Sequence, residues 1–156
     1  MVIVIQRVNR AACAVDGKVV SEIGKGLLVF AGVAETDTET DVRKAANKIS
    51  GIRIFEREDG KMGFSAADAG GDIMIVSNFT LLGRLKRGFR PDCTLAARPE
   101  KAEPYYDELC ALAEEMTPET VRVVKGVFGA DMQIEASLDG PFNIVFRTED
   151  VGAGNV

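Results

Sequence analysis

The sequence predicts a single α/β domain in which mixed β-sheets carry helices on one side. The chain has 156 residues, of which 46% are hydrophobic, so it is large enough to bury one core. Strand patterns outnumber helical patterns, and helical periodicity occurs in only two segments. Because these helices do not alternate with the strands, a doubly wound parallel sheet is not expected.

The first part of the chain contains strand and turn signals. Residues 2–15 are rich in Val, Ile and Ala, and Asp16-Gly17 predicts a hairpin that returns the chain along 18–23. Gly24-Lys25-Gly26 superficially resembles part of a phosphate-binding loop, but its place between two strand patterns indicates a turn. The continuous apolar run 27–33 is typical of a strand that is buried on both faces.

A helix is predicted after this run. Thr36 and Glu39 have the spacing of a capping box. An apolar stripe then recurs at helical spacing, at Val42, Ala45, Ala46 and Ile49. A short strand is expected over 52–55, followed by a turn at Asp59-Gly60.

The second half begins with the apolar run 73–76, which follows Gly70-Gly71 and is expected to be a strand. A second helix is predicted within 99–116, with Pro104 in its first turn because a proline further inside removes a backbone hydrogen bond. Its apolar face is expected to contain Ala102, Tyr105, Leu109, Leu112 and Met116.

Further strands are expected at 121–124, 132–138 and 142–146. Asp139-Gly140-Pro141 is expected to turn the chain before the last of them. No packing pattern follows, so we expect one domain over residues 1–147 and a flexible tail over 148–156. The long first strand and the late hairpin leave sheet edges, and dimerisation is one way to cover them.

Composition also indicates where the protein works. No apolar run approaches the ~20 residues that span a bilayer, and residues 1–5 lack the length and the basic lead of a signal sequence. We therefore expect a cytoplasmic protein without a membrane partner. Cys13, Cys93 and Cys110 form no C-x-x-C pair and are expected to be reduced packing residues. Cys93 lies in a polar loop, but no histidine is present to activate it.

The absence of histidine from the chain restricts its chemistry. It excludes a Ser-His-Asp triad, a Cys-His pair and a His-ligated zinc ion. The sequence also contains no G-x-x-x-x-G-K-[ST] phosphate loop. A site built from hydroxyls, amides and backbone groups remains, which would orient water and stabilise developing charge. We expect neither a cofactor nor a metal.

A polar cluster directly follows the predicted strand 73–76, and its residues are Ser77, Asn78, Phe79, Thr80 and Leu81. Hydroxyl and amide groups at the end of a buried strand are held still by the core behind them. Ser77, Asn78 and Thr80 are therefore the candidate catalytic residues.

A basic segment follows this cluster. The chain has a net charge of −5, yet four cations stand within 83–90, namely Arg84, Lys86, Arg87 and Arg90. The net charge argues against a non-specific nucleic-acid binder. The segment is either a solvated loop or a basic rim beside the site, and its position beside the polar cluster favours the rim.

Short motifs along nearly the whole chain resemble those of one family. They are Ile5-Gln6-Arg7-Val8, Gly24-x-Gly26-Leu27-Leu28-Val29, Arg53-Ile54-Phe55, Gly60-Lys61-Met62, Ser77-x-Phe79-Thr80-Leu81, Gly88-x-Arg90-Pro91, Ala130-Asp131-Met132-Gln133 and Asp139-Gly140-Pro141. Each motif is a weak signal, but their order and spacing together are specific. In these residues the chain resembles the D-aminoacyl-tRNA deacylases.

The resemblance implies a homodimer with a three-layer fold of two β-layers and one helical layer. It implies hydrolysis of the ester that joins a D-amino acid, or mischarged glycine, to tRNA, and hence chiral proofreading with aminoacyl-tRNA as the partner. The active site would lie at the subunit interface and be completed by Gly140-Pro141 of the other subunit, joined by a cis peptide bond. Cis occurs at only ~5–6% of X-Pro bonds, so the residues alone favour a trans turn.

The resemblance also implies roles for individual residues. The Thr80 hydroxyl and nearby backbone N–H groups would hold the ester carbonyl oxygen, and Phe79 would contact the substrate. Arg7 would brace Gly140 and Pro141, whose carbonyl oxygens would accept hydrogen bonds from the substrate α-ammonium. Phe89 would pack against the terminal adenosine or anchor its loop. The cations Arg84, Lys86, Arg87 and Arg90 would meet phosphates of the acceptor stem.

Some residues depart from the family pattern. Asn78 stands where the family usually has Gln, Leu138 replaces a usual Asn, and Phe142-Asn143 replaces Val-Thr. These departures motivate an alternative function, a module that binds aminoacylated tRNA 3′ ends with little or no turnover. A structural dimer without a tRNA role is a third hypothesis.

Overall fold

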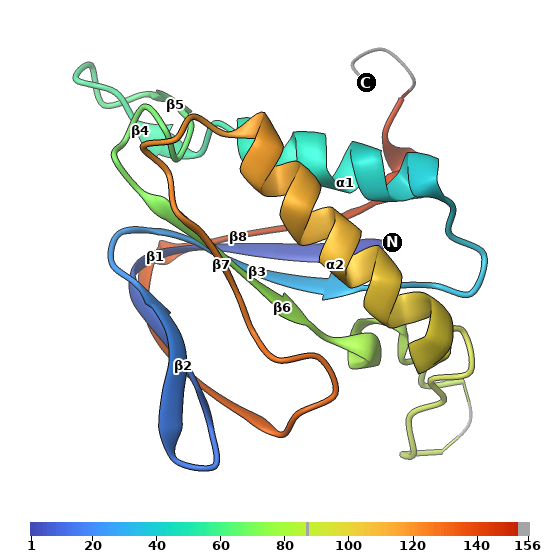
Figure 1. Cartoon of the computed structure of the whole chain (residues 1–156). Coiled ribbons are helices and arrows are strands. Elements are labelled where there is room, and N and C mark those ends of the chain that lie inside the picture. The colour runs from blue at the N-terminus through green and yellow to red at the C-terminus, as the bar shows by residue number, and fades with distance from the viewer. Residues whose placement is uncertain (87, 153–156) are drawn as a thin grey trace.

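Most of the strand patterns form one mixed sheet in a computed structural model that describes residues 1–86 and 88–152 (Figure 1). The elements, in chain order, are β1 (Val2–Val15), β2 (Lys18–Ile23), β3 (Gly26–Gly32), α1 (Glu39–Gly51), β4 (Phe55–Glu56), β5 (Met62–Phe64), β6 (Asp72–Ser77), the 3₁₀ helix η1 (Phe79–Leu82), α2 (Pro99–Met116), β7 (Val123–Lys125), β8 (Met132–Arg147) and the 3₁₀ helix η2 (Thr148–Asp150).

β1 organises the main sheet, because its length allows it to pair with three strands. Its first half pairs antiparallel with β3, its second half pairs antiparallel with β2, and β8 pairs antiparallel with both halves. The β3–β6 and β6–β7 pairs are parallel. The sheet has the order β2-β1-β3-β6-β7 with β8 attached to β1, so the predicted mixed α/β class is confirmed.

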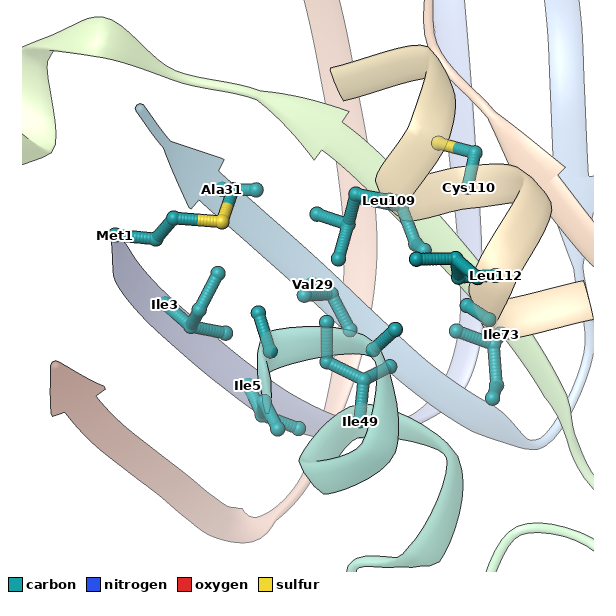
Figure 2. Packing of buried hydrophobic residues seen from close by; sticks show 14 of the residues in the cluster. Met1, Ile3, Ile5, Val29, Ala31, Ile49, Ile73, Leu109, Cys110 and Leu112 are labelled. Atoms are coloured by element: carbon teal, nitrogen blue, oxygen red, sulfur yellow. The ribbon is translucent and has the colours of Figure 1, made fainter. Parts of the chain in front are cut away.

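Both helices cover the same face of this sheet (Figure 1). Figure 2 shows Ile49 of α1 and Leu112 of α2 directed toward strand residues that include Ile5, Val29 and Ile73. All five side chains are buried. Since burying one such side chain stabilises the fold by about 1.5–3 kcal/mol, this face provides the larger core. Among the described residues, neither helix has the length and apolar character needed to cross a bilayer.

The opposite face of the same strands is buried as well. Leu27 packs in the core on the helix side, whereas Leu28 packs with Val8, Met74 and Val76 in a second cluster. Leu27 and Leu28 are at most 1% exposed. The prediction that residues 27–33 form a strand buried on both faces is therefore confirmed.

The start of α1 differs from the prediction. The helix begins at Glu39, and its capping box joins Thr38 to Asp41 rather than Thr36 to Glu39. The Asp41 carboxylate accepts a hydrogen bond from the Thr38 N–H at 3.0 Å. An Asp at the third helical position thus does the work that the sequence pattern assigned to Glu39.

Helix α2 begins earlier than predicted. It starts at Pro99, where a missing N–H leaves no helical bond unmade, and Pro104 consequently lies inside the helix. The tyrosine on its buried face is Tyr106, which is 1% exposed, whereas Tyr105 is only partly buried. Tyr106 stands four residues after Ala102 and three before Leu109, so these three side chains share one face.

The C-terminal part also differs from the prediction. β8 is one strand, and Asp139-Gly140-Pro141 forms a bulge inside it rather than a hairpin turn between two strands. The expected tail begins too early, because Thr148 is 1% exposed and its hydroxyl accepts a hydrogen bond from the Met1 ammonium at 2.6 Å. Residues 153–156 of that tail lie outside the described residues. The short β4–β5 hairpin was predicted only in part.

The Gly24-Lys25-Gly26 segment is a turn between β2 and β3, and its second glycine has a steric reason. Gly26 pairs with Asp72 of β6, and a β-carbon built on it would lie 2.0 Å from the Asp72 carbonyl oxygen. At Gly24 a β-carbon would meet no atom within 4 Å. The two glycines therefore differ sharply in their tolerance of a side chain.

We predict that Gly26→Ala lowers the free energy of unfolding by at least about 3 kcal/mol, because backbone atoms cannot rotate away from the new methyl group. The matched control Gly24→Ala should change it by less than about 1 kcal/mol. Urea unfolding followed by circular dichroism measures both. Equal midpoints for the two variants would contradict the close approach of β3 and β6.

Candidate active site

Strand β6 delivers the polar cluster to one end of the sheet. The Asn78 N–H donates to the Ala31 carbonyl oxygen of β3 at 2.8 Å, so the chain stays attached to the sheet after β6 ends. Asn78 Oδ1 accepts hydrogen bonds from the Thr80 N–H, at 3.1 Å, and from the Thr80 hydroxyl. One side-chain oxygen thereby caps η1 and orients both donors of Thr80.

The orientation of the Asn78 amide follows from these bonds. Because the backbone N–H of Thr80 is a donor, the atom that faces it is the amide oxygen, and Nδ2 lies on the other side. Within residues 1–86 and 88–152, Nδ2 makes no hydrogen bond. Asn78 therefore offers N–H donors to a ligand, whereas Thr80 offers the lone pairs of its hydroxyl.

The polar cluster lines a cavity of about 850 Å³, a size typical of small-ligand sites. Its walls come from the end of β3, from η1, from the first half of α2 and from the segment that precedes β8. The lining residues include Ser77, Asn78, Phe79, Thr80, Cys93, Ala102, Tyr106, Phe128, Asp131 and Met132. All four predicted residues from 77 to 80 thus lie together at this cavity.

The back of the cavity is chemically inert. The Tyr106 hydroxyl donates to the Ile75 carbonyl oxygen at 2.8 Å, and burial raises the pKa of Tyr106 far above its ordinary value. Burial also raises the pKa of the neighbouring Cys110 thiol to about 12. Both groups remain protonated at neutral pH, so they shape the wall and do not transfer protons.

Arg7 lies on β1 beside the bulge of β8. Its Nη1 donates to the Ile54 carbonyl oxygen at 2.6 Å, and its Nε lies 2.8 Å from Asp139 Oδ2. The guanidinium carbon also lies 5.0 Å from the centroid of the Phe142 ring, within cation–π range. These contacts hold a side chain that is only 9% exposed, so a buried charge has a carbonyl, a carboxylate and an aromatic face as partners.

The bulge presents Gly140 and Pro141 to the surface. Residues 139–142 stand opposite Arg7 alone in the register of the two strands. The Gly140–Pro141 peptide bond is cis, as the family resemblance implied, and both residues are exposed. Gly140 has a φ of +119°, and a β-carbon on it would lie 2.9 Å from the Phe142 nitrogen. Glycine is therefore the residue that fits here.

The predicted site residues thus form two groups within one chain. Ser77, Asn78, Phe79 and Thr80 line the cavity, whereas Arg7, Gly140 and Pro141 gather at the bulge and are not among the residues that line it. The sequence analysis missed the wall formed by Tyr106 and Phe128. A tyrosine on an apolar helix face gives no signal that distinguishes a pocket wall from ordinary core.

The predicted cations are arranged unequally. The Arg84 guanidinium is held by the Asp92 carboxylate at 2.9 Å, so this cation is already paired. Lys86 and Arg90 are exposed, and Arg87 lies outside the described residues. Phe89 is fully exposed, so it does not anchor the loop, and that alternative is wrong. Among the residues described, no group of three or more His, Cys, Asp or Glu side chains is placed to hold a metal ion.

Comparisons with known proteins agree with this geometry. The family model described as D-Tyr-tRNA(Tyr) deacylase matches residues 4–147. A D-aminoacyl-tRNA deacylase of Sulfurihydrogenibium sp. (strain YO3AOP1) is 44% identical and covers 97% of this chain and 100% of its own. The enzyme of the same name from Lactobacillus delbrueckii subsp. bulgaricus is 48% identical, over 93% of this chain and 98% of its own.

Solved structures show the same fold. The structure titled "c-Myc DNA Unwinding Element Binding Protein" has a TM-score of 0.86 and 36% identity, over 94% of this chain and 98% of that one. A probable eukaryotic D-amino acid tRNA deacylase has a TM-score of 0.79 at 18% identity, over 93% and 97%, which shows likeness of fold. Fold and sequence both place the chain in one class, the deacylases that act on aminoacyl-tRNA. The chain belongs to the D-Tyr-tRNA(Tyr) deacylase family.

We predict that Arg7→Lys lowers the free energy of unfolding by about 1.5–3 kcal/mol, because an ammonium cannot reproduce the planar contacts to Ile54, Asp139 and Phe142. Chemical denaturation measures the change. In the control Arg57→Lys, the half-exposed pair with Asp59 should contribute at most about 1 kcal/mol. A loss in Arg7→Lys no larger than in the control would show that the bulge does not depend on Arg7.

Proposed function

We propose that this protein hydrolyses the ester bond of D-aminoacyl-tRNA and of glycine mischarged on tRNA, and releases free tRNA and the amino acid. The observation that carries the proposal is the Asn78–Thr80 pair at the cavity, in a chain that belongs to the deacylase family. The activity is chiral proofreading of translation, which places the protein in the cytoplasm.

The hydrogen bonds of the pair suggest how labour is divided in the reaction. Both donors of Thr80 are directed to Asn78 Oδ1, so Thr80 is less suited to donate to the ester oxygen than the family resemblance implied. We assign that role to the Asn78 Nδ2 donors, which would stabilise negative charge as it develops on the ester oxygen. The Thr80 hydroxyl then accepts a hydrogen bond from the attacking water and orients it.

A second copy of the chain would complete the site. Gly140 and Pro141 are exposed on β8 and lie outside the lining of their own cavity. In a two-fold homodimer, the bulge of each protomer would enter the cavity of its partner. Main-chain carbonyl oxygens of the bulge would accept the substrate α-ammonium, so that a D side chain points to solvent and an L side chain meets the backbone. The three-layer β/β/α arrangement of the family forms part of this proposal.

A second candidate is a module that binds nucleic-acid ends, including aminoacylated tRNA 3′ ends, without turnover. The name of the similar structure, a DNA unwinding element binding protein, favours it. Charged tRNA that is bound and keeps its amino acid would support this candidate over the hydrolase.

The hydrolase makes a stereochemical prediction. Purified protein should release D-tyrosine from D-tyrosyl-tRNA and glycine from glycyl-tRNA, and spare L-tyrosyl-tRNA. Asn78→Asp keeps the oxygen that orients Thr80 and removes the N–H donors, so kcat should fall about 10²- to 10³-fold. The control Asn9→Asp makes the same charge change at an exposed position of β1. Equal rates for the two tyrosine enantiomers, or an unchanged kcat in Asn78→Asp, would contradict the proposed site.

The free cations of the basic loop make an electrostatic prediction. Lys86→Gln combined with Arg90→Gln should weaken tRNA binding and reduce the slope of log affinity against log salt by about 1.4–1.8, because each lost phosphate contact removes about 0.7–0.9. Filter binding at several salt concentrations measures the slope. A control with Lys18→Gln and Lys61→Gln, both exposed elsewhere, should keep it. Identical slopes in the two double variants would remove the loop from the interface.

A further inference from the structure

The loop between η1 and α2 has a closed base. Arg84 and Asp92 exchange two backbone hydrogen bonds of 2.9 Å, in addition to their 2.9 Å ion pair. Asp92 Oδ1 also accepts a hydrogen bond from the Thr94 N–H at 2.9 Å. The base is thus fixed by several bonds, and the segment between Arg84 and Asp92 projects from it.

The projecting tip exposes apolar and cationic side chains together. Phe89 is fully exposed and Leu85 is 72% exposed, and Lys86 and Arg90 stand in solvent beside them. No ring contact or cation–π contact involves Phe89 within the described residues. Its ring therefore contributes no packing to the fold, and an exposed aromatic of this kind is typical of a binding surface.

The charge of the tip indicates its partner. The chain as a whole carries −5, whereas the described tip residues carry two cations and no anion. Aromatic side chains interleaved with cations bind single-stranded nucleic acid, because the ring stacks on a base while the cations meet the phosphates. Thr80 at the cavity lies only a few residues before the loop, so the tip is placed beside the end of the nucleic acid that enters the cavity.

We infer that Phe89 is a stacking platform for an unpaired base of the RNA whose ester enters the cavity. Lys86 and Arg90 contact the phosphates that flank this base. The inference rests on the proposed function and adds a recognition contact that is separate from the Asn78–Thr80 chemistry.

The composition of the chain provides a direct test, because it contains no tryptophan. Phe89→Trp places a single indole at the tip, and stacking on a base should quench its fluorescence. The probes are uncharged tRNA with its unpaired 3′ nucleotides and the same tRNA trimmed of them. Quenching is expected with the first and not with the second. The control Val19→Trp, on a side chain 61% exposed in β2, should respond to neither.

Affinity gives a second measurement. Phe89→Ala should raise the Kd for untrimmed, uncharged tRNA about 5- to 150-fold, whereas Phe89→Tyr should keep it within about twofold. The thermal midpoint of Phe89→Ala should equal that of the unchanged protein, because Phe89 packs against nothing that folding requires. An unchanged Kd in Phe89→Ala would overturn the inference.

Two further outcomes would also overturn it. Equal quenching by trimmed and untrimmed tRNA would indicate phosphate contacts alone, and quenching by phosphatidylserine vesicles in place of RNA would indicate a membrane surface. These binding tests need no turnover, so they fail independently of the proposed hydrolysis. A protein that is quenched by tRNA and does not hydrolyse the ester would overturn only the proposed function. A protein that hydrolyses it without quenching would overturn only the stacking.

Discussion

One acceptor atom, Asn78 Oδ1, holds the candidate active site in its arrangement. It receives both donors of Thr80, while the main chain of Asn78 is tied to β3 through Ala31. These bonds direct the Asn78 donors and the Thr80 lone pairs to the ligand side. The shorter amide that replaces the family's glutamine therefore keeps the same chemical groups, placed closer to the end of β6. The buried β3–β6 pair behind them supplies the rigidity that preorganised donors require.

The bulge of β8 imposes a second constraint, which acts at some distance from the cavity. Arg7 is buried, and its contacts to Ile54, Asp139 and Phe142 connect β1 to two other parts of the chain. Phe142, where the family has valine, gives the guanidinium an aromatic face that a valine would not offer. The same bulge leaves Gly140 and Pro141 on the surface. Chemistry and chiral recognition would thus reside on different protomers, which makes the proposed activity depend on assembly.

The charge distribution separates binding from catalysis. Hydroxyl and amide groups form the polar wall of the cavity, and burial keeps Tyr106 and Cys110 protonated behind it. Proton transfer by the protein is therefore a small part of the mechanism, and the lability of an aminoacyl ester makes it unnecessary. Cations for a polyanionic substrate stand on a loop of an otherwise acidic chain, where the Arg84–Asp92 pair secures the base and leaves Lys86 and Arg90 free. This arrangement favours the docking of one region of a nucleic acid over coating of its backbone.

The sequence by itself determined the mixed α/β class, most strands, the two helices and the polar cluster after β6, because these depend on local periodicity and turn chemistry. It also indicated the family, through motifs spread along the chain. Only the tertiary structure decided that β8 continues through Gly140 and Pro141, that Tyr106 rather than Tyr105 is buried, and that Thr148 is packed against the N-terminus. It also decided that Thr80 is turned toward Asn78 and that Phe89 stands free of the core. Strand register, helix rotation and side-chain pairing depend on contacts between residues far apart in the chain, and a local pattern carries no information about them.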